Sequence, residues 1–154
     1  MPFYKPTGLK HVRATITFDG TAGLGEASTA VPVFTIAGRV LVERITAYCT
    51  VDLTEAMATA TVALGTATDV DKFIAVTNST AIDAGEWWAT ATPTAGAASI
   101  TTPAVTDPTT AGVQGQPTAI DEDIIITPAT QDTDAGTLVI DCWYEPITAG
   151  ASLS

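Results

Sequence analysis

The sequence predicts an all-β fold: a single-domain β-sandwich, jelly-roll-like in topology, with one long loop and an extended N-terminal arm. Three observations carry this prediction. The chain has 154 residues, the length of one ordinary domain. Apolar and polar residues alternate in short segments rich in β-branched side chains, which suits half-buried strands. Glycine, aspartate and proline lie between these segments, where turns are expected.

Eight segments carry the strand pattern. The two longest are "RVLVERITAYCTVDL" at 39–53 and "GTLVIDCWYEPI" at 136–147, which Gly136 opens and Pro146 closes. The other six are, in chain order, "HVRATITF", "VPVFTI", "ATATVALG", "DKFIAVT", "GEWWAT" and "IDEDIIIT". Turn signals separate them, among them "DGTAGLG", "GTATDVD" and "DTDAG". Eight short strands with this punctuation indicate a sandwich or barrel.

One segment competes as a helix, "LTEAMATATVAL" at 53–64. Its Thr59 and Thr61 have branched side chains that suit a pleated strand better than a helix. Gly65 follows directly. We therefore expect a strand from about Ala58, with a helical turn before it at most.

The domain organisation has two parts. Residues 1–14 form the expected N-terminal arm, and residues 15–154 form the sandwich. Within the sandwich, residues 89–119 are rich in Ala, Thr, Pro and Gly and predict a long loop or a hairpin excursion around 98–105. The arm combines two prolines with aromatic residues and cations, which would keep it extended and direct it to an acidic surface.

The charge of the chain is strongly negative and unevenly distributed. The net charge is −11 and the pI about 4.1, which argues against a nucleic-acid partner because phosphate binding needs Lys and Arg. All six cations lie in residues 1–72, whereas residues 73–154 carry ten carboxylates and no cation. We expect the cation-free half to face solvent. No apolar run is long enough to span a membrane and no secretion signal opens the chain, so we expect a soluble, unexported protein.

Two adjacent tryptophans, Trp87 and Trp88, precede the long loop. Neighbouring side chains of a strand point to opposite faces, so one ring should face inward and the other outward, as should Trp143 and Tyr144. A neighbouring subunit, the 89–119 loop or a stacked sugar could cover the outward ring. We favour the subunit and expect an interface made by Phe3, Tyr4, Lys5, Lys10, Arg13, Trp87, Trp88 and Tyr144.

The sequence contains few candidates for catalytic or metal-binding sites. His11 is the one histidine, and no nucleophile motif accompanies it. The carboxylate clusters match no calcium loop and select no glycosidase pair. Cys49 and Cys142 lie in strand-like segments and are expected to be buried thiols, with a disulfide as the alternative. We expect no catalytic residue, no metal ligand and no cofactor, and therefore no enzyme.

Three stretches resemble the small virion proteins of tailed bacteriophages, above all capsid decoration or cement proteins. They are "TAGLGEASTAVPVFTIAGRVLVERITAYCTVDL", "VALGTATDVDKFIAVTNSTAIDAGEWW" and "GTLVIDCWYEPITAG". The resemblance implies a non-catalytic homotrimer, made in the host cytoplasm, that binds the major capsid protein on the capsid exterior and stabilises contacts between capsomers. Alternatives are a glycan-binding head-fibre or tail-associated sandwich, a tail-tube or head-completion protein, and a hydrolase with scattered carboxylates.

Overall fold

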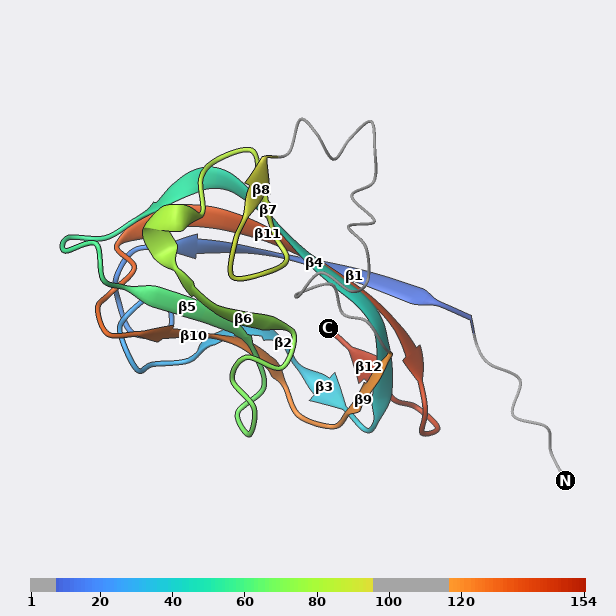
Figure 1. Cartoon of the computed structure of the whole chain (residues 1–154). Helices are drawn as coiled ribbons and strands as arrows, with labels where there is room; N and C mark the ends of the chain where they lie inside the picture. The colour runs from blue at the N-terminus through green and yellow to red at the C-terminus, as the bar shows by residue number, and fades with distance from the viewer. Residues whose placement is uncertain (1–7, 96–116) are drawn as a thin grey trace, which may run out of the picture.

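Two sheets face each other across one core in the computed structural model, which describes residues 8–95 and 117–154 (Figure 1). The large sheet has the order β1 (Lys10–Phe18), β11 (Ala135–Pro146), β4 (Val40–Thr54), β7 (Glu86–Trp88) and β8 (Thr94–Ala95), with β9 (Thr118–Ile120) paired to the start of β4. The small sheet has the order β2 (Val31–Phe34), β10 (Ile124–Ala129), β5 (Thr61–Gly65) and β6 (Ile74–Asn78).

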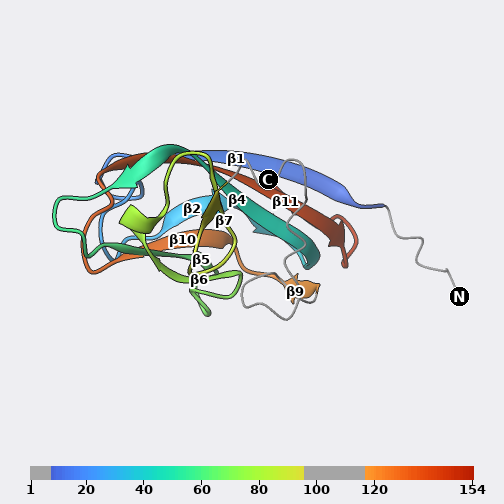
Figure 2. The same ribbon diagram turned by 45° about the horizontal axis from the view of Figure 1, so that its top comes forward.

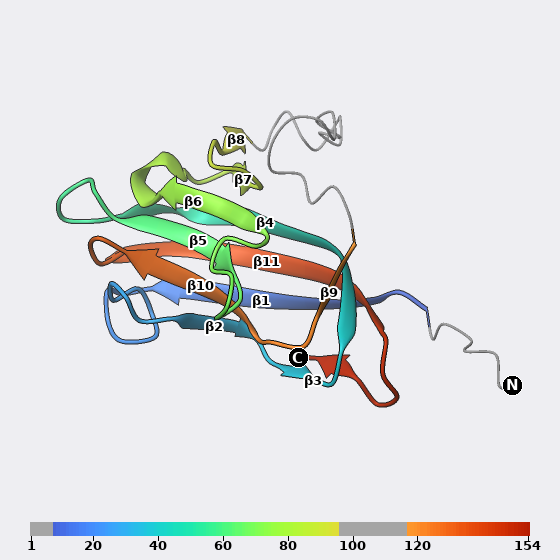
Figure 3. The same ribbon diagram turned by 60° about the horizontal axis from the view of Figure 1, so that its bottom comes forward.

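The strand order is that of a jelly roll. When the short strands β3, β8, β9 and β12 are set aside, successive strands alternate between the sheets except for the β5–β6 hairpin. The large sheet then has the order β1, β11, β4, β7 and the small sheet β2, β10, β5, β6. Figure 3 shows the small sheet in front of the large one. This arrangement of eight antiparallel strands forms two Greek keys. The predicted all-β sandwich is therefore confirmed.

Each of the eight predicted segments contains a strand. β5 begins at Thr61 rather than near Ala58, and the competing helix at 53–64 does not form. The helical structure in the described residues is one 3-10 turn, Ser79–Ala81. A small pair, β3 (Ile36–Ala37) with β12 (Ser152–Leu153), ties the C-terminal segment to the sandwich.

The predicted boundary between arm and sandwich at residue 14 is wrong. All nine residues of β1 pair with β11 in one unbroken register, from Lys10 opposite Tyr144 to Phe18 opposite Gly136. The alternation that predicted a strand at 11–18 simply continues one residue further toward the N-terminus. Phe3, Tyr4 and Lys5 lie outside the described residues, as does the hairpin expected at 98–105.

The core fills the space between the sheets. Trp88, Leu64, Ile74, Ile126 and Ile140 are among its largest fully buried side chains. Both cysteines are free thiols buried in this core, as predicted. A shift of register in β4, opposite the step from Trp143 to Tyr144, turns both Val42 and Ile45 inward, although simple alternation would separate them.

Candidate functional site: the outer face of the large sheet

The outer face of the large sheet presents aromatic rings and cations in rows across the strands. We use "outer face" for the outward side chains of β1, β11, β4 and β7. Figure 2 shows the ribbons of β1, β11 and β4 along one side of the molecule. Strand register places residues distant in sequence side by side. The rows are His11, Trp143 and Arg44; Arg13, Asp141 and Thr46; and Thr15, Val139, Tyr48 and Trp87.

Trp143 stands in the first row between two neighbours. The rings of His11 and Trp143 have centroids 4.9 Å apart and are tilted by 33°. On the other side the Arg44 guanidinium carbon lies 5.4 Å from the centroid of the Trp143 ring, a cation–π contact. β1 and β4 flank β11 on opposite sides, so this half-buried indole has a neighbouring side chain of the same sheet on each side.

Asp141 is the buried charge of the second row. Its side chain is 8% exposed, although it points out of the sandwich. Arg13 donates from Nε to Oδ1 at 2.8 Å and from its terminal nitrogen to Oδ2 at 3.0 Å, while His11 Nε2 lies 2.6 Å from Oδ1. Burial opposes ionisation of Asp141, but the hydrogen bonds and charges of Arg13 and His11 together lower its pKa. A fixed carboxylate therefore holds two basic side chains of β1 against the sheet.

Tyr48 and Trp87 close the third row. Their ring centroids lie 4.9 Å apart, tilted by 52°, and both side chains are half-buried. The indole Nε1 of Trp87 is shielded from solvent and has no hydrogen-bond partner in the part of the chain that the structure describes. The two tryptophans of the outer face thus lie on different strands and different rows.

Two predicted interface residues belong to the core instead. Trp88 is fully buried, with its Nε1 donating to the Thr77 hydroxyl at 2.8 Å. Tyr144 is 3% exposed, with its hydroxyl 3.4 Å from the carbonyl of Leu153. The prediction that these two side chains face a partner is wrong. At Trp88, strand alternation left open which face is inward. Trp87, Lys10 and Arg13 do lie at the surface.

Sequence reasoning missed Trp143 and its neighbours on the outer face. A usable signal was present, because Leu138, Ile140 and Cys142 form one apolar parity and Tyr144 continues it. Trp143 therefore had to face outward. The partners of Trp143 in its row carried no local signal, since His11 and Arg44 reach it only through sheet pairing.

Carboxylates gather at one end of the sandwich, where β1, β4, β6 and β10 end. The loops and strand ends there are 19–30, 52–60, 79–86 and 130–135, at the left in Figure 3, and they contain no Lys or Arg. They carry eight carboxylates, namely Asp19, Glu26, Asp52, Glu55, Asp83, Glu86, Asp132 and Asp134. Several brace the loops: Asp132 accepts from the Ala27 amide at 2.8 Å and Asp19 from the Thr21 hydroxyl at 2.6 Å.

The expectation that the cation-free half of the chain faces solvent is also wrong as stated. β10 and β11 belong to that half, yet both are central strands, and β11 lies between β1 and β4. In the fold, the uneven charge of the sequence appears as a difference between the two ends of the sandwich, one of which carries eight carboxylates and no Lys or Arg.

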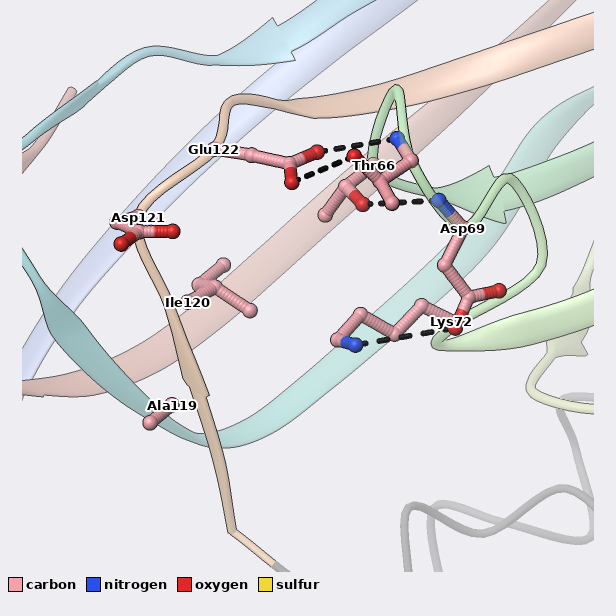
Figure 4. A pocket seen from close by; sticks show the side chains of 8 residues that line it. Thr66, Asp69, Lys72, Ala119, Ile120, Asp121 and Glu122 are labelled. Carbon is pink, nitrogen blue, oxygen red and sulfur yellow. Dashed lines mark hydrogen bonds and ion pairs between the residues drawn. The ribbon is translucent and has the colours of Figure 1, made fainter.

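A small hollow of about 120 Å³ lies between the β5–β6 turn and the β9–β10 turn (Figure 4). Glu122 accepts from the Thr68 amide at 3.0 Å and from its hydroxyl at 2.7 Å, and these bonds lower the pKa of Glu122. Lys72 lies 3.7 Å from Asp69. Through these contacts the polar groups of the hollow hold the β5–β6 turn in place.

The remaining features concern the cysteine thiols, metal-ligating side chains and membrane-spanning helices. Burial raises the pKa of Cys49 to about 11 and that of Cys142 to about 12, so both thiols stay protonated at neutral pH. Within the described ranges, no group of three or more His, Cys, Asp or Glu side chains is placed to hold a metal ion. Those ranges also contain no helix with the length and apolarity to cross a membrane.

Comparison with known proteins gives no family assignment. The chain matches no model of a known protein family, and no curated protein sequence matches it significantly.

Proposed function

We propose that this chain is a structural virion protein of a tailed bacteriophage, which binds the outside of the capsid and stabilises contacts between capsomers without catalysis. The observation that carries the proposal is the outer face, where half-buried aromatic rings and cations lie together on a rigid sheet. Aromatic residues and arginine are enriched at protein interfaces, whereas most of the chain's surface charge is negative.

The charge distribution suggests an orientation for the bound protein. Lys10, Arg13 and Arg44 belong to β1 and β4 on the side away from the acidic end. In the proposed complex the outer face meets an acidic surface of the major capsid protein, and the acidic end points to solvent. Each bound copy stabilises the assembled shell by mass action, because it binds that state and not the dissociated one.

The jelly roll also occurs in lectins, so glycan binding is the competing function. A sugar platform needs a ring with one free face. Trp143 has His11 on one side and Arg44 on the other, which favours protein docking over sugar stacking at this position.

The test measures binding to heads of the phage whose genome encodes this chain. Purified protein is mixed with expanded heads, sedimented and quantified. The variant Arg44→Glu should lower occupancy at least tenfold at subsaturating protein, because it reverses the charge of an outward cation in the Trp143 row of the docking face.

The matched control is Arg39→Glu, which changes the net charge equally. Arg39 pairs with Asp121 away from the outer face, so occupancy should stay at the wild-type level. Circular dichroism of both variants checks folding. Equal losses in the two variants, or no binding of the wild type to heads, would contradict the proposal, as would binding to a glycan array in its place.

The N-terminal arm is tested separately by deleting residues 2–7, which leaves β1 intact. A deletion that extends to residue 13 would remove part of a paired strand and confuse unfolding with lost binding. Unchanged head occupancy after the short deletion would remove the arm from the docking surface.

A further inference from the structure

β1 has a free edge that differs from the other edges of the sandwich. Its nine residues pair with β11 without any shift of register, and they contain no proline. In the described part of the chain no strand pairs with the opposite edge of β1. A long, regular edge offers a row of unpaired backbone donors and acceptors, which invites another strand.

The remaining edges are short or protected. β2, the edge of the small sheet beside β1, has four residues and includes Pro32. β6, at the opposite side, lies against β7 and the segment after it, where the Thr77 hydroxyl contacts Trp88 Nε1 and the Thr90 carbonyl. β8 has two residues. Short length, proline and cover by a neighbouring segment keep edges from pairing, and within the described residues β1 has none of these three.

We propose that β1 pairs with β1 of a second copy of this chain, antiparallel, so that the two large sheets form one continuous sheet across a twofold axis. Such an isologous contact needs a self-complementary edge. The inference goes beyond the proposed function and does not depend on it, because pairing is a property of the free protein.

The charge along β1 fits this pairing. Its basic side chains, Lys10, His11 and Arg13, occupy one half of the strand, and the other half is uncharged up to Asp19. A parallel arrangement would place like charges opposite each other, which destabilises a pair. The antiparallel arrangement places the basic half opposite the uncharged half.

Full overlap fixes the register of the pair at Ala14. Arg13 then lies opposite Thr15 of the second copy, and His11 opposite Thr17, all on the outer face. Outward residues meet outward residues, as a continuous sheet requires. Directly opposite side chains have Cβ atoms roughly 5 Å apart, close enough for their charges to interact.

Substitution of the exposed Thr15 tests this register. Thr15→Lys places a lysine opposite Arg13 twice in each pair and should raise the dimer dissociation constant at least tenfold. Thr15→Glu places a carboxylate opposite Arg13 and should lower the dissociation constant. The matched controls are Thr54→Lys and Thr54→Glu, at an exposed threonine at the end of β4 remote from the edge, and both should behave as wild type.

Light scattering over a concentration series gives the mass, and hydrogen–deuterium exchange of the 10–18 segment gives the location of the contact. The expected results are the mass of two copies and slower exchange in this segment at high concentration. A mass of one copy, or the three copies implied by the resemblance to decoration proteins, overturns the inference. The inference is also overturned if the protein has the mass of two copies but Thr15→Lys does not change the dimer dissociation constant. The same holds if hydrogen–deuterium exchange in β1 does not slow at high concentration.

Discussion

The two sides of β11 bury their residues by different means. On the inner side Leu138, Ile140 and Cys142 are fully buried, because they meet the small sheet across the core. On the outer side the Asp141 side chain is 8% exposed although no second layer of the described sandwich covers it. Its cover consists of Arg13 and His11 from the adjacent strand. Inner residues are buried by the opposite sheet, whereas outer residues are buried by side chains of adjacent strands in the same sheet. Substitutions on the two sides should therefore lower the free energy of unfolding by different amounts.

The largest effect is expected on the inner side, at Trp88. Trp88→Ala removes a fully buried ring and leaves the Thr77 hydroxyl without its donor. The free energy of unfolding should fall by about 3–5 kcal/mol, measured by urea denaturation. Trp87→Ala on the same strand, at the half-buried outer face, is the control and should cost clearly less. Equal losses would erase the distinction between the faces.

Asp141→Asn should give the largest effect on the outer side. The substitution removes the charge that holds Arg13 and His11, and we expect a loss of about 2 kcal/mol at pH 7. Asp71→Asn, at an exposed loop carboxylate, should change stability by less than about 0.5 kcal/mol in the same denaturation experiment.

The pH dependence sharpens this prediction. The pKa of Asp141 is lowered in the folded protein, so its ionised form contributes stability above the ordinary aspartate value of about 3.9. That contribution is lost as the pH falls through the lower folded value. The stability difference between wild type and Asp141→Asn should therefore shrink as the pH falls below about 4. A difference that keeps growing below that pH would contradict the assigned sign.

Trp143→Ala should lower the free energy of unfolding by about 1.5 kcal/mol, less than Trp88→Ala or Asp141→Asn. It removes a half-buried ring with one aromatic and one cation–π neighbour. Thermal unfolding measures the change. The double substitution with Arg44→Ala should lose less than the sum of the two single losses, because both remove the same contact. Strict additivity would mean that the contact contributes nothing.

The smallest effect is expected at Tyr144→Phe. The ring remains buried and only the hydroxyl bond to the Leu153 carbonyl, 3.4 Å long, is lost. We expect a loss of about 0.5 kcal/mol by denaturation. The burial of Tyr144 excludes it from the docking surface. A Tyr144→Phe variant that keeps its stability but no longer binds heads would contradict that exclusion.

Much of the fold could be predicted from local patterns, and little of the outer face could. The alternation at 136–147 and the turn residues around it located β11, and the buried state of Cys142 followed from the same pattern. The cluster of His11, Arg13 and Asp141 could not be found this way, because Asp141 lies about 130 positions from the other two in the chain. Only the pairing of β1 with β11 brings them together.

The sequence by itself determined the class of fold, the positions of the eight main strands and the buried cysteines, since these depend on residue type and on a period of two within one segment. Tertiary structure decided the jelly-roll strand order, the inward orientation of Trp88 rather than Trp87, and the clustering of the carboxylates at one end. Alternation fixes only that neighbours point oppositely. Which side becomes the interior depends on the strand that packs against it, and that strand comes from elsewhere in the chain.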